Sequence, residues 1–77
     1  MKALNYRIML RKELEGGYTV LVPSLPGCVT FGETIDQAVE MAREAIELYI
    51  ESLREAKEDI PTDDNTLEYN LMVESHV

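Results

Sequence analysis

The chain has 77 residues and a formal net charge of −8, with a sequence pI near 4.4. A domain of this size buries only about 60–65% of the surface of its unfolded chain, so a second subunit would add useful core. The acidic balance disfavours a nucleic-acid partner, the single Cys28 excludes an internal disulfide, and without a signal peptide or a run of the ~20 apolar residues that span a bilayer we expect a cytoplasmic protein.

The first third of the chain predicts a β-meander. Residues 3–11 alternate between apolar and polar side chains, which indicates a half-buried strand. Gly16 and Gly17 mark a hairpin, and residues 18–22 are rich in β-branched and aromatic side chains. Pro23 ends this second strand, a tight turn follows at residues 24–27, and residues 28–31 are predicted to form a third strand.

A long amphipathic helix is predicted from Thr34 to about Lys57. Thr34 and Gln37 have the spacing of a capping box, in which each side chain bonds a free backbone N–H near the helix start. At 100° per residue, one face is apolar, and Met41 and Leu48 widen it beyond what one small sheet covers. We therefore predict a homo-oligomer, most simply a dimer, with Met41 and Leu48 in its interface.

Acidic side chains crowd the opposite side of the predicted helix. Their i, i+4 spacing makes them repel one another, so a solvated acidic face is the simplest interpretation. The functional alternative is a docking surface for a basic protein, which would relieve the repulsion. The candidate partner-binding residues are Asp36, Glu40, Glu44, Glu47 and Glu51.

Residues 59–65 form a polar linker, and residues 66–74 alternate again, which predicts a fourth strand. The order βββαβ gives a single α+β domain over residues 1–77. Its four-stranded, mainly antiparallel sheet would carry one long helix on one face and leave the other face uncovered.

No constellation of residues suggests catalysis or a cofactor. Cys28 is best explained as a small buried side chain, Ser24 as a turn residue, and His76 lies next to the chain end. One Cys and one His cannot supply a zinc site, and the first strand has no carboxylates for a two-metal nuclease. We therefore expect no enzyme, no catalytic residue, no metal and no cofactor.

The stretch from Tyr18 to Ile50 resembles the HicB family, the antitoxins of bacterial and archaeal HicA-HicB modules. The family pattern combines Tyr-x-Val-x-x-Pro-x-Leu-Pro-Gly-Cys with Gly-x-Thr and an Ala-rich helix. It is matched by Tyr18, Val20, Pro23, Leu25, Pro26, Gly27, Cys28, Gly32, Thr34, Ala38 and Ala45. The acidic residue usual after the first Pro is replaced by Ser24.

The resemblance implies a partially RNase-H-like fold and the neutralisation of HicA, a small basic toxin that cleaves messenger RNA with a histidine. Many HicB proteins add a C-terminal DNA-binding module, whereas we expect this chain to be a short form without one. Direct operator binding is not expected. The alternative is a stand-alone HicB-like oligomeric scaffold without a cognate toxin.

Overall fold

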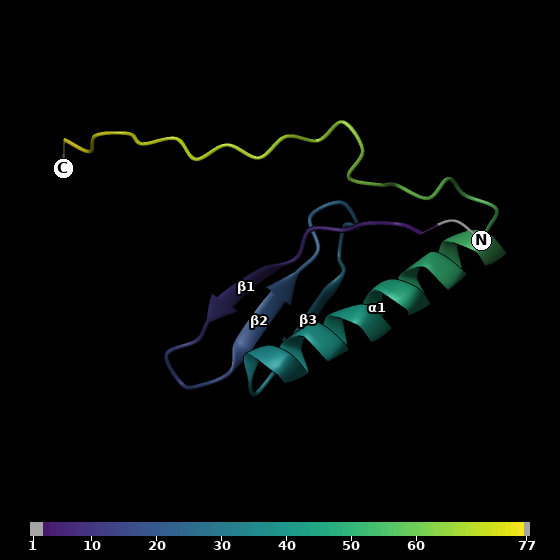
Figure 1. Ribbon diagram of the computed structural model, residues 1–77, viewed down its shortest axis with the longest axis horizontal. Helices are drawn as coiled ribbons and strands as arrows, with labels where there is room; N and C mark the ends of the chain where they lie inside the picture. The colour runs from purple at the N-terminus through teal and green to yellow at the C-terminus, as the bar shows by residue number, and fades with distance from the viewer. Residues whose placement is uncertain (1–2, 77) are drawn as a thin grey trace.

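A computed structural model describes residues 3–76 of the protein. Residues 3–76 contain three short strands and one long helix. An extended C-terminal stretch follows the helix (Figure 1). The elements are β1 (Met9–Lys12), β2 (Tyr18–Leu21), β3 (Val29–Gly32) and α1 (Ile35–Glu55). The structure is thus α+β, as the sequence predicts.

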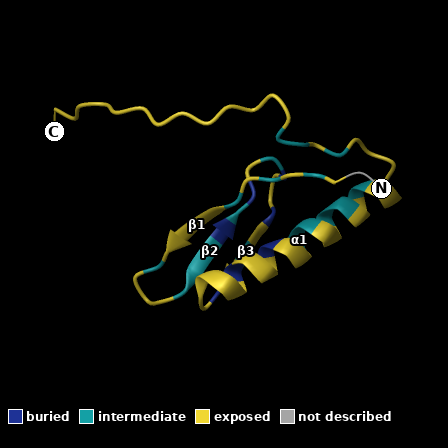
Figure 2. Ribbon diagram, viewed as in Figure 1, coloured by how far each residue is buried: buried dark blue, intermediate teal, exposed yellow. Residues whose placement is uncertain are grey.

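The three strands form one antiparallel sheet in the order β1-β2-β3. Helix α1 packs against β2 and β3 on one face of this sheet. Val20 of β2 is fully buried there against Ala38 and Ala42 of the helix, with Ile8 and Tyr18 at the margin. Figure 2 shows the buried residues gathered where the sheet meets the helix.

Helix α1 approaches β3 closely because Gly32 has no side chain. A Cβ at position 32 would lie 2.3 Å from the backbone N of Ala38 and 2.4 Å from its Cα. Because both neighbours are backbone atoms, they cannot move aside as a flexible side chain could. Gly32 therefore sets the distance between the helix and the sheet.

The turn between β2 and β3 carries its own small core. The Val22 N–H donates to the Cys28 carbonyl at 3.1 Å, and Leu25 packs fully buried against both residues. Gly27 has a φ of +81°, a conformation that residues with a Cβ rarely adopt. The Tyr49 hydroxyl of α1 donates to the Pro26 carbonyl at 2.7 Å, so the turn is fastened to the helix.

Helix α1 is capped at both ends. The Thr34 hydroxyl accepts from the Gln37 N–H at 3.1 Å, as predicted, but the Gln37 side chain accepts from Glu33 N–H, one residue before the predicted donor. The helix ends at Glu55, two residues before the predicted end, because Lys57 takes a φ of +56°. Helical hydrogen bonding does not continue through that conformation.

The first strand is shorter than the sequence predicts. Met9 pairs with Leu21, so Ile8 would face Val22 and the earlier residues would face the turn. Val22 bonds Cys28 across that turn, and Pro23 begins it. Residues 3–8 therefore have no neighbouring strand to pair with and remain outside the ladder.

The sheet has three strands instead of the predicted four, because residues 66–74 form no strand within one chain. We call residues 59–76 the C-terminal arm; Figure 1 shows it running away from the body of the molecule. Its root is held at several points: Tyr6 hydroxyl donates to Pro61 O at 2.6 Å, and the Arg7 guanidinium meets Thr66 O at 3.1 Å and Glu68 Oε1 at 3.2 Å. Beyond Glu68 the apolar side chains are exposed.

Candidate protein-binding surface

The candidate partner-binding residues lie together on the outer face of α1. This face is opposite Ala38 and Ala42, which pack on the sheet. All five carboxylates are exposed, as the helical spacing predicts. We call this set the acidic band: Asp36, Glu40, Glu44, Glu47 and Glu51.

Within residues 3–76, the acidic band makes no ion pair with a Lys or Arg side chain. Each carboxylate has another one turn away on the helix, and exposed like charges at that spacing repel by a few tenths of a kcal/mol per pair. The helix is held in place by its buried side instead. A cationic partner would therefore gain attraction and also remove this repulsion.

Met41 and Leu48, the predicted oligomer contacts, lie along the flank of α1. Met41 is 36% exposed and Leu48 is 67% exposed, so both are available to a second molecule. Leu48 stands out because little of its side chain contacts its own chain. Their role in an interface stays a prediction.

The residues of the family pattern shape the backbone. Leu25 and Cys28 fill the turn core, Pro23, Pro26 and Gly27 fix its path, and Gly32 with Thr34 joins the sheet to the helix. Their positions place the N-terminus of α1 and so orient the acidic band. None of them lies in that band.

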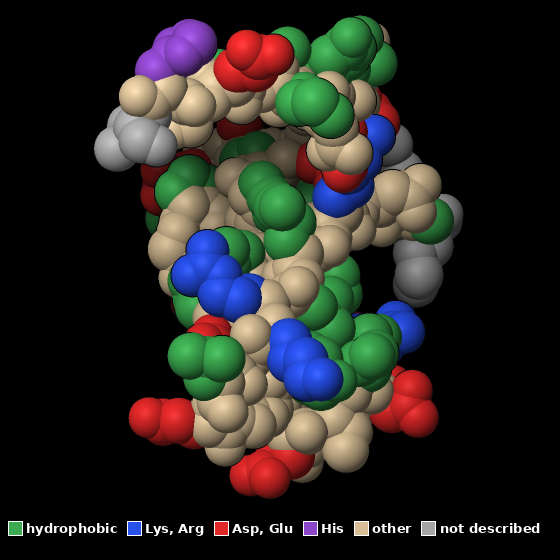
Figure 3. Space-filling model, turned by 90° about the vertical axis from the view of Figure 1, so that its left-hand side faces the viewer, with side chains coloured by type: hydrophobic (Ala, Val, Ile, Leu, Met, Phe, Trp, Pro, Cys, Tyr) green, Lys and Arg blue, Asp and Glu red, His purple; other side chains and the backbone are tan. Residues whose placement is uncertain are grey.

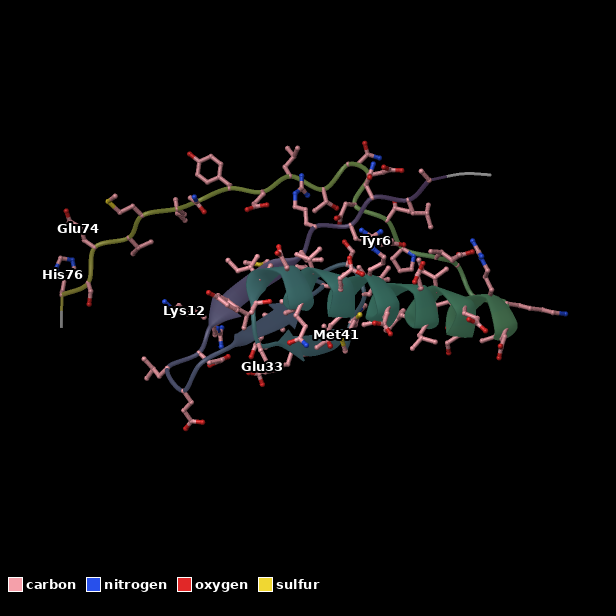
Figure 4. The ribbon with its side chains drawn as sticks, turned by 60° about the horizontal axis from the view of Figure 1, so that its bottom comes forward. Tyr6, Lys12, Glu33, Met41, Glu74 and His76 are labelled. Atoms are coloured by element: carbon pink, nitrogen blue, oxygen red, sulfur yellow. The ribbon has the colours of Figure 1, made fainter. Side chains whose placement is uncertain are left out.

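Of the side chains weighed for catalysis, Ser24 and Cys28 lie in the segment between β2 and β3, and His76 lies on the arm. Burial raises the pKa of the Cys28 thiol, and the Ser24 hydroxyl donates to the Asp63 carboxylate. Figure 4 places His76 and Glu74 at the far end of the arm, away from Met41 on the helix. Among the described residues, no three His, Cys, Asp or Glu side chains gather as a metal site, and no helix there has the length and hydropathy to cross a membrane.

Sequence reasoning missed the contacts at the root of the arm. The Ser24 hydroxyl and then the Arg7 backbone N–H donate to Asp63, and these hydrogen bonds lower the pKa of that carboxyl group. Burial, with the nearby Asp63 charge, raises the pKa of Tyr6 beside them. A signal for this contact exists in the charges: residues 1–12 contain four Lys or Arg and no Asp or Glu, whereas residues 59–68 contain four acids and no base.

Known proteins resemble this chain over most of its length. Residues 6–75 match the family described as HicB-like antitoxin of bacterial toxin-antitoxin system. A UPF0150 protein of Synechocystis sp. is 47% identical over 60 residues, covering 78% of this chain and 76% of the relative. A UPF0150 protein of Thermoplasma acidophilum is 45% identical over 60 residues, covering 78% and 87%.

Two antitoxins are among the similar proteins. Antitoxin HicB 1 of Photorhabdus laumondii is 38% identical over 61 residues, which are 79% of this chain and 39% of that longer protein. The crystal structure of the N-terminal domain of Burkholderia pseudomallei antitoxin HicB superposes with a TM-score of 0.66 at 35% identity, covering 88% of this chain and 72% of that one. These matches confirm the resemblance seen in the sequence. The chain belongs to the HicB-like antitoxin family.

Proposed function

We propose that the protein is the antitoxin of a toxin-antitoxin pair and that it binds and neutralises a small, basic HicA-type toxin through the acidic band. Membership of the family supports the antitoxin role in general. The acidic band supports the particular surface, since its five carboxylates are exposed and without an ion pair to Lys or Arg in the described part of the chain.

The proposed mechanism is occlusion. A negative field along one side of a 21-residue helix attracts a cationic protein from solution and orients it before contact. Once bound, the antitoxin covers the basic surface with which such a toxin would grip RNA. No group of the antitoxin takes part in chemistry, so we assign it no enzymatic activity.

The fourth strand and the partial RNase-H-like fold belong to the same proposal. The arm root already lies beside residue 7 through the Arg7–Glu68 ion pair. An apolar groove next to that edge is lined by Leu4, Tyr6 and Ile8 on one side and by Val39 and Ile46 of α1 on the other. Paired along this edge, residues 66–74 would complete a four-stranded sheet beside the groove.

Surface plasmon resonance against the product of the neighbouring gene, where that gene encodes a small basic protein, tests the proposal. Replacing Glu44 and Glu47 by Lys should lower the association rate constant by about tenfold at low salt, with a smaller effect at high salt. The matched control replaces Glu15 of the hairpin and Glu74 of the arm by Lys. It changes the net charge equally but leaves the acidic band intact, so its association should slow much less.

Equal association rates for the two double variants across a salt series would remove the acidic band from the mechanism. The absence of any binding to the neighbouring gene product would instead favour the second candidate, a stand-alone oligomeric scaffold. The uncovered apolar face of the sheet is the observation that favours this alternative. Circular dichroism of each variant checks that α1 is intact.

A further inference from the structure

The face of the sheet turned away from α1 carries a row of apolar side chains. Strand register places Met9, Leu21 and Val29 directly opposite one another across all three strands. Met9 and Val29 are each 55% exposed, and Leu21 is half-buried. We call this set the outer row.

Two further features extend the outer row. Phe31, 46% exposed, lies two residues beyond Val29, and its ring fills the space that a side chain at Gly17 would need. At the other end, Met9 lines a hollow together with Leu67 and Tyr69 of the arm root. Apolar surface therefore runs from β3 across the sheet and onto the arm.

This surface has no cover within the described chain. An antiparallel sheet packed on one side normally shows polar side chains to water on the other. Here α1 covers only the inner face, so the outer row is left facing solvent. A continuous exposed apolar patch on a sheet face is a candidate protein-binding surface.

The distribution of charge favours a second copy of this chain as the partner of the outer row. The strands contain no Asp or Glu, and β1 adds Arg11 beside the outer row. Glutamates border only its Phe31 end, and the acidic band lies on the far side of the molecule. Figure 3, which views the molecule from its left-hand side in Figure 1, shows hydrophobic and Lys or Arg side chains in the middle of that side, with acidic ones above and below them. Two copies that stack by this face keep their acidic bands apart, whereas contact through α1 would bring them together.

We propose that the outer row is the self-association face and that two copies stack sheet against sheet about a two-fold axis. The row is self-complementary because Leu21 lies at its centre, with Met9 and Val29 on either side. The arm roots beside Met9 add their exposed Leu67 and Tyr69 to the contact. The helix stays free, so one dimer can present two acidic bands.

The size of the face predicts a weak dimer. Three strands of four residues span roughly 14 Å by 14 Å, well below the ~800 Å² per partner of a standard interface. The arm roots enlarge the contact, but because it stays small we expect only weak association, with a dissociation constant of about 10–100 µM. Added salt should tighten the dimer, because it screens repulsion between two chains of charge −8.

Sedimentation equilibrium of the full chain between about 1 and 500 µM tests the proposal, a range that brackets the expected dissociation constant. The wild type should pass from monomer to dimer within this range. Val29→Glu should weaken the dimer by at least about tenfold, because an unpaired charge would enter an apolar contact twice by symmetry. Leu48→Glu is the matched control on the flank of α1, and it should leave the dimer intact.

Thermal unfolding checks that both variants fold, which is expected because both side chains are more than half exposed. A wild type that stays monomeric throughout would overturn the proposal. So would a folded Val29→Glu that keeps the dimer mass, or a Leu48→Glu that loses it, which would return the interface to the helix. None of these readouts involves the toxin, so they stand or fall separately from the proposed function.

Discussion

Two stretches of the chain have similar alternating sequences but very different surroundings. Residues 18–22 and residues 66–74 both place apolar side chains at every second position. Val20 in the first is fully buried, whereas Leu67 in the second is 92% exposed. The first is strand β2 of the sheet, and the second is an arm without a strand partner.

The difference lies in the neighbours. Strand β2 has β1 on one side, β3 on the other and α1 above it. The arm is held near its root, through Tyr6, Arg7 and Ser24. An alternating segment can therefore form a strand, but it does so only where the edge of a neighbouring strand is free to pair with it. Substitutions in the sheet and α1, the body of the molecule, should therefore cost more stability than substitutions at the root of the arm.

The largest effect is expected from Gly32→Val, which attacks the contact between β3 and α1. The new side chain would overlap the backbone of Ala38, and forcing the helix outward should cost about 3 kcal/mol or more. Because a domain this small has little stability to lose, the variant should be largely unfolded at 37 °C. Urea denaturation followed by circular dichroism measures the loss. A midpoint equal to that of the wild type would show that the helix does not depend on this close approach.

Gly27→Val should cost less, about 1–3 kcal/mol, because it strains only the backbone of the turn. A Cβ at position 27 meets no atom within 4 Å, so the φ of +81° is the sole obstacle. Asn tolerates this conformation better than Val does. Gly27→Asn should therefore recover much of the stability, whereas Gly32→Asn should not recover it. If Gly27→Asn proved as harmful as Gly27→Val, the strain argument for the turn would fail.

The smallest effect is expected from Ser24→Ala, which acts at the arm root. The hydrogen bond from Ser24, followed by that from the Arg7 N–H, holds the pKa of Asp63 below its usual range. The stability that these bonds add is present above the ordinary Asp pKa near ~3.9 and is lost as pH falls through the lowered value. NMR titration should show the pKa of Asp63 rising toward its ordinary value in Ser24→Ala.

The thermal midpoint of the body should hardly change in that variant, because α1 and the sheet do not rest on the arm. Limited proteolysis should cut the arm faster, since its root has lost a contact. An unchanged Asp63 titration would mean that the Ser24 hydrogen bond does not form in solution. A large drop in the thermal midpoint would instead show that the stability of the sheet and α1 depends on the arm.

Sequence reasoning reached the body of the fold because local rules govern it. The glycines, the prolines and the Thr34 cap act on their own backbone, so the meander, the turn and the helix start were predictable. The ends of the strands were not predictable, because the length of β1 depends on where its pairing with β2 stops. That pairing ends at Leu21, and Val22 bonds Cys28 instead. The arm root depends on contacts between residues more than 50 positions apart, such as Tyr6 with Pro61.

The acidic band was predictable from helical spacing alone, because exposed charges on one side of an amphipathic helix need no tertiary information. The outer row needed the register between strands. Met9, Leu21 and Val29 are far apart in sequence, and nothing in their spacing shows that they lie side by side. Once the register is known, the uncovered face follows directly.

Cys28 gives the protein an internal reporter of its own opening. It is the single cysteine of the chain, it lies 6% exposed beneath the turn, and burial raises its pKa, so the reactive thiolate is scarce in the folded state. A thiol reagent can reach the sulfur only when the turn, with Leu25, lifts away from Tyr49. The labelling rate of the unmodified protein therefore counts these openings, with no added probe to disturb the fold.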